Sequence, residues 1–142
     1  MTKITLKEKQ IETSLEELKN YIGTTADVAR KWFEQESPEI KKRQFKQKGG
    51  LNDKKKGAVY VYFDKNRQVL YVGETGGGVK ERTHFKTARH TETEWWPKWQ
   101  RVRFMSMVDR TSRLTLEMLL ILAYQPPYNK KPEARKIEEL FS

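Results

Sequence analysis

The sequence contains no cysteine and no apolar run long enough to cross a membrane. The absence of cysteine from its 142 residues excludes disulfide scaffolds, thiolate metal sites and cysteine nucleophiles. The longest apolar run, MLLILAY at 118–124, is far shorter than the roughly 20 residues that span a bilayer. The opening MTKITLKEKQ lacks the apolar core of a signal peptide. We therefore expect a cytoplasmic protein without a membrane segment.

Acidic residues are scarce relative to basic ones. Lysine and arginine number 29 against 19 aspartate and glutamate residues, which gives a formal net charge of +10. Such an excess favours a polyanionic partner, most commonly nucleic acid. Hydrophobic residues make up 36% of the chain and aromatic residues 11%, enough for one modest core. No segment pairs a broad apolar face with a lysine-rich one, so a membrane-surface role is not expected.

Residues 1–56 are predicted to form a helical, basic N-terminal extension. Ser14 has a glutamate three residues later, the spacing of a capping box at a helix start. Gly23 is placed to end that helix, and a second helix is expected to begin at Thr25. A third helix is expected from Ser37, which a proline follows at the first helical position.

A basic linker is predicted at 40–56. Its sequence, IKKRQFKQKGGLNDKKK, holds eight lysine and arginine residues against one acid, and its glycine pair favours irregular structure. The N-terminal helices and this linker are candidates for nucleic-acid binding or for dimerisation. The basic residues expected to contact phosphates are Lys41, Lys42, Arg43 and Lys46 of the linker, and Lys80 and Arg89 further along the chain.

From residue 57 to residue 142 the pattern changes to a mixed α+β domain. Two tyrosine-bearing apolar runs separated by DKNRQ indicate a β-hairpin. A later segment alternates apolar and polar residues, as a strand with one buried face does. We expect a three-stranded antiparallel sheet flanked by helices. The expected elements are strands at 58–63, 69–73 and 99–109, a basic helix after the glycines at 76–78, a buried helix at 111–125 and a short helix at 132–141.

Glu117 is the only charged side chain in LTLEMLLILAY, and its helical neighbours are Leu114, Leu120 and Ile121. An unpaired carboxylate in such surroundings destabilises a fold by several kcal/mol. Glu117 must therefore reach solvent, pair with a cation or bind a metal. A lone carboxylate suits Mg²⁺, which often takes one or two protein ligands and keeps several waters.

Three other features allow two interpretations each. Arg82 could clamp a phosphate with its planar guanidinium or be a solvated helix residue. His84 and His90 are the only histidines, and their spacing gives little support to a zinc site. The three tryptophans of EWWPKW at 94–99 could stack on bases, but core packing is the expectation in so small a chain.

Five elements in chain order resemble the GIY-YIG nuclease family. AVY at 58–60 stands where the family has GIY, and YVG at 71–73 matches YIG. Arg82, Glu117 and Asn129 match the arginine, glutamate and asparagine that follow. The resemblance covers about residues 57–131 and is nearest to the branch of small restriction-type enzymes. The ordered set is more specific than either tripeptide alone.

The resemblance implies a metal-dependent endonuclease acting on DNA. One Mg²⁺ or Mn²⁺ ion would be held by Glu117, and Arg82 would hold the scissile phosphate. Tyr60 is assigned as general base, and Tyr71 would position the water or exchange that role. Asn129 would hold the backbone or a ligand in place by hydrogen bonds. Tyr62 shares the face of Tyr60 in the expected strand and is assigned to packing.

The sequence departs from the family pattern at several positions. Ala58 replaces the first glycine of GIY. Glu74 follows YVG, where the family sometimes has a lysine. Lys86 stands where many members have a histidine, and His84 lies two residues earlier. His84 and Lys86 are therefore candidates for an accessory role only.

Two other classes of function remain open on the sequence. The chain could be a nucleic-acid-binding module without catalytic activity on a nuclease-like scaffold, or an adaptor whose basic surface binds an acidic protein. RNA is not excluded as the nucleic acid. A monomer or a weak homodimer is expected, and because one site of this kind cleaves one strand, a double-strand break requires a dimer or two successive events.

Overall fold

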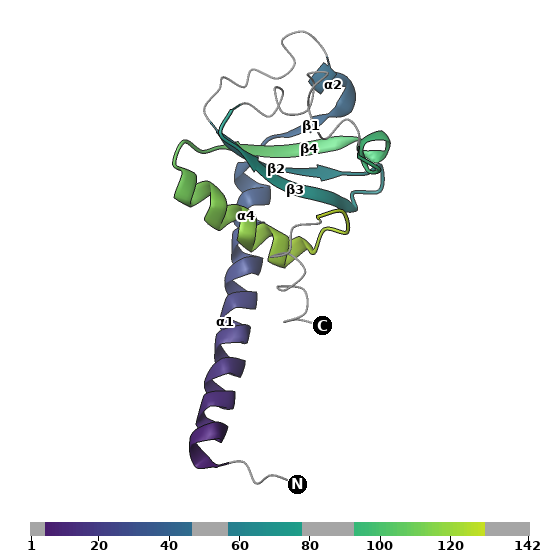
Figure 1. Cartoon of the computed structure of the whole chain (residues 1–142). Helices are drawn as coiled ribbons and strands as arrows, with labels where there is room; N and C mark the ends of the chain where they lie inside the picture. Colours follow the sequence, from purple (N-terminus) through teal and green to yellow (C-terminus); the bar gives the residue numbers. More distant parts are fainter. Residues whose placement is uncertain (1–4, 47–56, 78–92, 130–142) are drawn as a thin grey trace.

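A computed structural model describes residues 5–46, 57–77 and 93–129 of the chain (Figure 1). It has the α+β architecture expected, with a sheet of four antiparallel strands in the order β1-β4-β2-β3 in place of the three predicted. None of the helices in these ranges has the length and apolarity needed to cross a membrane. The elements are α1 (Leu6–Glu36), β1 (Glu39–Lys41), α2 (Lys42–Lys46), β2 (Ala58–Phe63), β3 (Val69–Thr75), the 3₁₀ helix η2 (Trp96–Lys98), β4 (Arg101–Ser106) and α4 (Arg110–Tyr124).

The predicted hairpin is present as β2 and β3, joined by the five residues expected. The Asp64 carboxylate closes the turn by accepting hydrogen bonds from the backbone N–H groups of Asn66 (2.8 Å) and Gln68 (2.9 Å). Arg67 has a left-handed φ of 62°, as one residue of such a connection commonly must. The register then pairs Tyr60 with Gly73 directly across the two strands.

The two faces of the sheet carry different cores. The aromatic face consists of Tyr60, Tyr62, Tyr71, Trp95 and Trp99, with Val102 of β4 packed among them. The helical face consists of Val59, Val61 and Val72, and it is covered by Leu116 and Leu120 of α4 and by Phe33 of α1. In Figure 1, α4 lies against β3 and β2 and crosses α1. Burial of Trp95 and Trp99 confirms the packing role predicted for them.

A single long helix replaces the first two helices predicted. Its capping box is formed by Thr5 and Glu8, and Ser14 is an interior residue. Gly23 does not end it, because a glycine inside a helix costs only about 1 kcal/mol and helical residues extend on both sides. The hydroxyl of Thr25, expected as a cap, donates to the carbonyl oxygen of Tyr21 one turn earlier.

The helix predicted from Ser37 is present only as the short α2, so the start of the predicted basic linker is a strand and a helix turn instead of irregular chain. Ser37 is the C-cap of α1 with extended backbone (φ −89°, ψ 137°), which is the conformation favoured before a proline. Arg103 of β4 donates to the carbonyl oxygens of Glu34 (2.9 Å) and Ser37 (2.8 Å), and so caps a helix whose last turn has no basic residue of its own. The chain then continues as β1, which pairs with β4 and supplies the fourth strand.

A partly buried polar contact joins the C-terminal parts of α1 and α4. Tyr124 donates a hydrogen bond of 2.6 Å to the carboxylate of Glu34, which also lies 3.4 Å from Arg30. Burial, followed by the hydrogen bond to the carboxylate, raises the pKa of the Tyr124 phenol above its ordinary value. This contact anchors the end of α1 to the body of the protein.

Candidate active site

The phenol of Tyr60 lies across β3, directly over Gly73. A Cβ atom on Gly73 would stand 2.6 Å from both Cζ and Oη of Tyr60 and 2.8 Å from Cε1 of Tyr71. No side chain fits there, so the glycine of YVG is required by the close approach of the two tyrosines. The Tyr60 and Tyr71 rings are stacked, with centroids 6.4 Å apart and planes inclined by 28°.

The two tyrosines differ in their access to solvent. Tyr60 is fully buried, whereas Tyr71 is partly exposed and stacks on Trp95 at 5.1 Å. Tyr62 is also fully buried, with its ring 4.9 Å from Trp95 and 5.0 Å from Trp99. This confirms the packing role predicted for Tyr62. It also places Tyr71 nearer to water than Tyr60.

Asn129 binds the outer edge of β3. Its Oδ1 accepts from the Val72 N–H at 2.9 Å, and its Nδ2 donates to the Val72 carbonyl at 2.8 Å. The N–H of Tyr128 also donates to the Leu70 carbonyl at 3.3 Å. Since β3 is an edge strand, the buried amide pairs with it as a neighbouring strand would. Of the two uses expected for this side chain, holding the backbone is the one these bonds perform.

Glu117 lies in the middle of α4 and is 6% exposed. It follows Arg113 by four residues, so the two side chains leave the same side of the helix. The guanidinium of Arg113 reaches Glu74 of β3, with Nε 3.0 Å from Oε2. This side of α4 therefore faces β3. Tyr60 approaches β3 from the aromatic face, Glu117 from the helical face, and Asn129 at the edge itself.

Arg113 and Glu74 form a partly buried ion pair that the sequence did not predict. Besides binding Glu74, Arg113 Nη1 donates to the carbonyl oxygens of Met107 (3.0 Å) and Val108 (2.6 Å). Arg113 is 8% exposed, and a buried guanidinium with several acceptors holds its neighbours rigidly. The departure from the family pattern at Glu74 was the one signal in the sequence. The contact fixes the first turn of α4, and hence Glu117, relative to β3.

The donor set for a metal at this site is small. Within the ranges the structure describes, no group of three or more histidine, aspartate and glutamate side chains could hold an ion. Glu74 binds Arg113, and Glu117 is the candidate ligand that the family resemblance implies. One carboxylate completed by waters and a substrate phosphate fits Mg²⁺, which usually keeps several waters, and Mn²⁺ accepts the same oxygen ligands.

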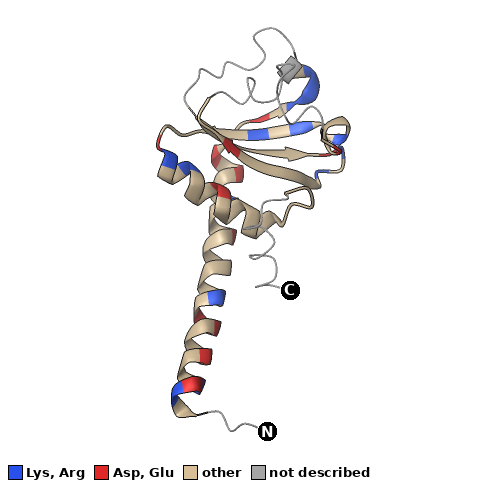
Figure 2. Cartoon of the chain, in the orientation of Figure 1, with Lys and Arg blue, Asp and Glu red and all other residues tan. Residues whose placement is uncertain are grey.

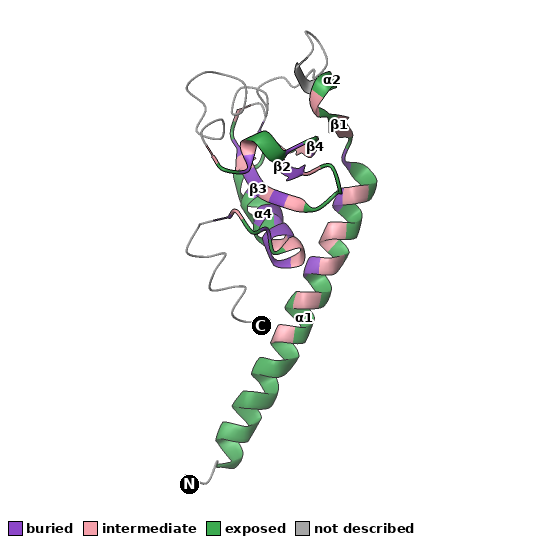
Figure 3. Ribbon diagram, turned by 90° about the vertical axis from the view of Figure 1, so that its right-hand side faces the viewer, coloured by how far each residue is buried: buried purple, intermediate pink, exposed green. Residues whose placement is uncertain are grey.

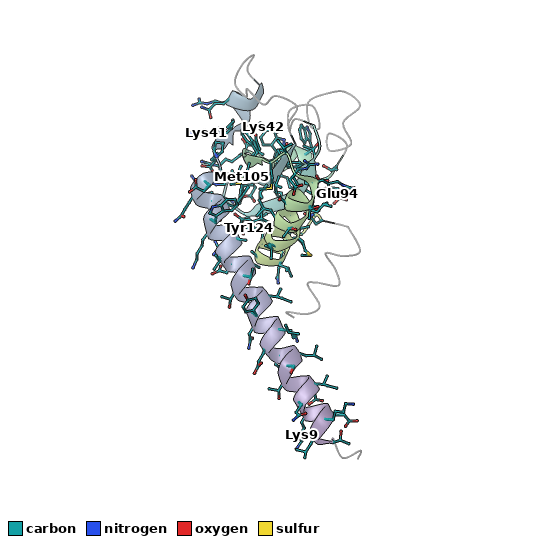
Figure 4. The ribbon with its side chains drawn as sticks, turned by 90° about the vertical axis from the view of Figure 1, so that its left-hand side faces the viewer. Lys9, Lys41, Lys42, Glu94, Met105 and Tyr124 are labelled. Atoms are coloured by element: carbon teal, nitrogen blue, oxygen red, sulfur yellow. The ribbon has the colours of Figure 1, made fainter. Side chains whose placement is uncertain are left out.

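A basic groove lies at another part of the sheet, beside the β2–β3 turn. It is lined by Lys41, Lys42, Arg43, Lys65, Gln100 and Arg101. Figure 2 shows blue basic segments on β1, α2 and β4, and Figure 4 shows Lys41 and Lys42 near β1 and α2 with Lys9 at the far end of α1. Lys42 Nζ lies 5.0 Å from the Trp99 ring centroid, a cation–π contact. Lys65 and Arg101 could not be assigned from sequence, because the pairing of β4 with both β2 and β1 brings them to this groove.

The predicted residues thus divide into three groups. Tyr60, Tyr71, Glu117 and Asn129 lie around β3, and Lys41, Lys42 and Arg43 line the basic groove. Lys46 ends α2. Six residues singled out in the sequence lie outside the described residues: Lys80, Arg82, His84, Lys86, Arg89 and His90. The helix predicted at 132–141 lies outside them as well. Comparison of the chain with protein-family models, curated proteins and solved structures found no match.

Proposed function

We propose that the protein is a metal-dependent endonuclease that hydrolyses phosphodiester bonds in DNA by a GIY-YIG-type mechanism. The observation that carries this proposal is the position of the Tyr60 phenol over Gly73, with Tyr71 stacked beside it. An aromatic ring over a cross-strand glycine is also a packing device in sheets, so the feature that supports a function here is the second phenol, that of Tyr71, stacked beside the first. A pair of phenols brought to the edge of a sheet, where Glu117 approaches from the other face, suits proton transfer near a bound phosphate.

The chain's own residues divide the chemistry as follows. Tyr60 is the general base for the attacking water, and Tyr71, which lies nearer to solvent, positions that water or exchanges the role. A phenol has a pKa near 10 in water, so a tyrosine base near neutral pH requires a nearby cation. Arg82 is assigned to the phosphate. Its positive charge there would lower the pKa of the tyrosine base and would neutralise charge that develops on the phosphate. Asn129 keeps β3 in register beneath the tyrosines.

Glu117 would hold Mg²⁺ or Mn²⁺, which when bound supplies charge stabilisation of the leaving 3′ oxygen and of a non-bridging phosphate oxygen. The ion pair between Arg113 and Glu74 sets the position of that carboxylate. Arg113 is therefore a positioning residue, and it does not itself touch the substrate.

The basic groove would add phosphate contacts beyond the one at the scissile phosphate. Tyr60 lies three residues before the end of β2, and Lys65 lies in the turn that follows. At about 3.3 Å per strand residue, the end of the strand is roughly 10 Å from Tyr60, or about three base-pair steps of B-DNA at 3.4 Å each. One duplex could therefore contact the groove and the tyrosine site together, with the groove supplying contacts independent of sequence.

A plasmid-cleavage assay tests the proposal. Wild-type protein should nick supercoiled DNA with Mg²⁺ or Mn²⁺, and EDTA should abolish nicking. Glu117→Gln and Tyr60→Phe should each reduce the rate by about 100-fold or more. Tyr62→Phe is the matched control, because Tyr62 lies two residues along the same strand on the same face and should cleave as wild type does. Nicking that survives both of the first two substitutions would contradict the proposal.

A second candidate is a nucleic-acid-binding module without catalytic activity, which the basic groove alone would support. It predicts salt-dependent binding of DNA or RNA with no cleavage under any metal. In that case Glu117→Gln and Tyr60→Phe would leave binding unchanged and would have no cleavage to remove. The plasmid assay and a binding titration on the same proteins therefore separate the two functions.

A further inference from the structure

One face of α1 is apolar along its length, but only part of that face is covered. Near the C-terminal end, Ala26 and Phe33 are buried against the body of the protein. In Figures 1 and 3 the remaining length of the helix projects away from the sheet, and Figure 3 colours most of it exposed. Four of the exposed large apolar residues of the projecting part form one series along the helix: Ile11 (51% exposed), Leu15 (54%), Leu18 (55%) and Ile22 (37%). Leu6 and Tyr21 are exposed as well but lie outside this series.

These four residues have the spacing of a coiled-coil seam. They follow one another at intervals of four, three and four positions, the alternation of a and d positions in a heptad repeat. The pattern is also symmetric about its midpoint. A second α1 running in the opposite direction therefore places Ile11 opposite Ile22 and Leu15 opposite Leu18. Each of these contacts occurs two times in the pair, as a two-fold interface requires.

The charges of the projecting segment, residues 6–25, argue for a second copy and against a polyanion. The segment has three lysines and four glutamates, so its net charge is −1 in a chain whose total is +10. This part of the helix therefore lacks the excess positive charge that a nucleic-acid surface needs. The basic groove, at the other end of the molecule, has that charge.

The charges also select the direction of pairing. In the antiparallel alignment Glu12 lies beside Lys19 of the second copy, and Glu8, which occupies a seam position, meets Thr25. In a parallel alignment the two Glu8 side chains would face each other at the seam, which is unfavourable for like charges. Antiparallel pairing satisfies the apolar and the charged positions together.

We propose that residues 6–25 of α1 form an antiparallel helix pair with the same segment of a second copy of this chain. The interface is isologous and places the two sheet domains at opposite ends of the paired helices. It stands on the helix alone and does not depend on the proposed nuclease activity. If that activity holds, the pair supplies the second catalytic site that cleavage of both strands requires.

Sedimentation equilibrium of the full chain over about 1–500 μM, a range that covers weak to moderate association, tests the proposal. The wild-type mass should rise from 16.9 kDa towards twice that value. Leu15→Lys with Leu18→Lys should give the monomer mass at every concentration, and far-ultraviolet circular dichroism should show an intact fold, since both residues are exposed in one chain. Thr13→Lys with Asn20→Lys adds the same charge outside the seam and should dimerise as wild type does.

The absence of cysteine allows the direction of pairing to be tested by cross-linking. When Ile11→Cys and Ile22→Cys proteins carrying different tags are mixed and oxidised, the covalent product should be the mixed dimer. Ile11→Cys alone should give little product. A wild-type chain that stays monomeric, or a seam variant that still dimerises, would overturn the proposal. Efficient cross-linking of Ile11→Cys alone would overturn the antiparallel direction.

Discussion

Substitution of Gly73 by alanine perturbs the site at the point where its geometry is tightest. The new methyl carbon would lie 2.6 Å from the Tyr60 phenol and 2.8 Å from the Tyr71 ring, well inside van der Waals contact. Neither ring can move away freely. Tyr60 is fully buried, and Tyr71 is stacked on Trp95. The substitution must therefore displace at least one tyrosine.

The expected magnitude follows from the cost of inserting one methyl group into a packed core. Overpacking of this kind costs about 1–3 kcal/mol, which for a domain near 140 residues corresponds to a melting temperature lower by roughly 3–12 °C. Misplacement of a catalytic group by about 1 Å can reduce a rate by about 100-fold. Cleavage at a temperature where the Gly73→Ala protein is fully folded should therefore fall by about that factor.

Gly76→Ala provides the control, because it makes the same chemical change three residues away. A Cβ on Gly76 would find only Arg113 Nη2, at the ordinary contact distance of 3.7 Å. Thermal melts and plasmid nicking should therefore be near wild type for Gly76→Ala and impaired for Gly73→Ala. A Gly73→Ala protein that melts and cleaves as wild type does would refute the assignment of the tyrosine site.

Asn129, Tyr124 and Lys65 each allow one further measurement. Asn129→Ala leaves two buried backbone groups of β3 unpaired and should lower the urea-derived free energy of unfolding by about 2–4 kcal/mol; no change would contradict its edge-pairing role. The raised pKa of Tyr124 adds to the free energy of unfolding. This contribution is complete below the unfolded phenol pKa near 10 and is lost as pH rises above it. The fall in the free energy of unfolding above pH 10 should therefore be shallower in Tyr124→Phe than in wild type. Lys65→Ala should reduce the slope of log affinity for DNA against log salt by about 1, whereas Lys9→Ala, remote from the groove, should not.

The hairpin and α4 were predictable because their signals are local. Asp64 closes the turn within four residues of chain, and alternating or continuous apolar residues define the strands and the helix around it. Expected and observed bounds of these elements agree within a few residues. The length of the turn alone would pair Tyr60 with Val72. The observed pairing with Gly73 also requires the register shift between Tyr62 and Phe63, which no local pattern indicates.

The N-terminal part is helical as predicted, but its helix bounds were predicted wrongly because two local signals compete there. Ser14 and Thr5 each have a glutamate three residues later, and sequence alone does not say which pair starts the helix. At Ser37 the same residue types can begin or end a helix. The outcome depends on Arg103, sixty-six positions away, which binds the carbonyl of Ser37. No local pattern contains that contact.

In the candidate site, too, the residues with local signals were predictable and the contacts between distant residues were not. The motif indicated Tyr60, Tyr71, Glu117 and Asn129, whose residue types are distinctive. The supporting contacts were out of reach, because Arg113 meets Glu74 across thirty-nine positions, and the basic groove exists only once β1 pairs with β4.

A crystal of the protein with a short DNA duplex and Mn²⁺ tests the central claim most directly. Anomalous scattering locates manganese without reference to the protein density. We predict a peak at coordination distance from the Glu117 carboxylate, with a DNA phosphate between it and the tyrosines at Gly73, and no peak in Glu117→Gln crystals. Manganese bound elsewhere on the chain beside the DNA, with Glu117 uncoordinated, would contradict it.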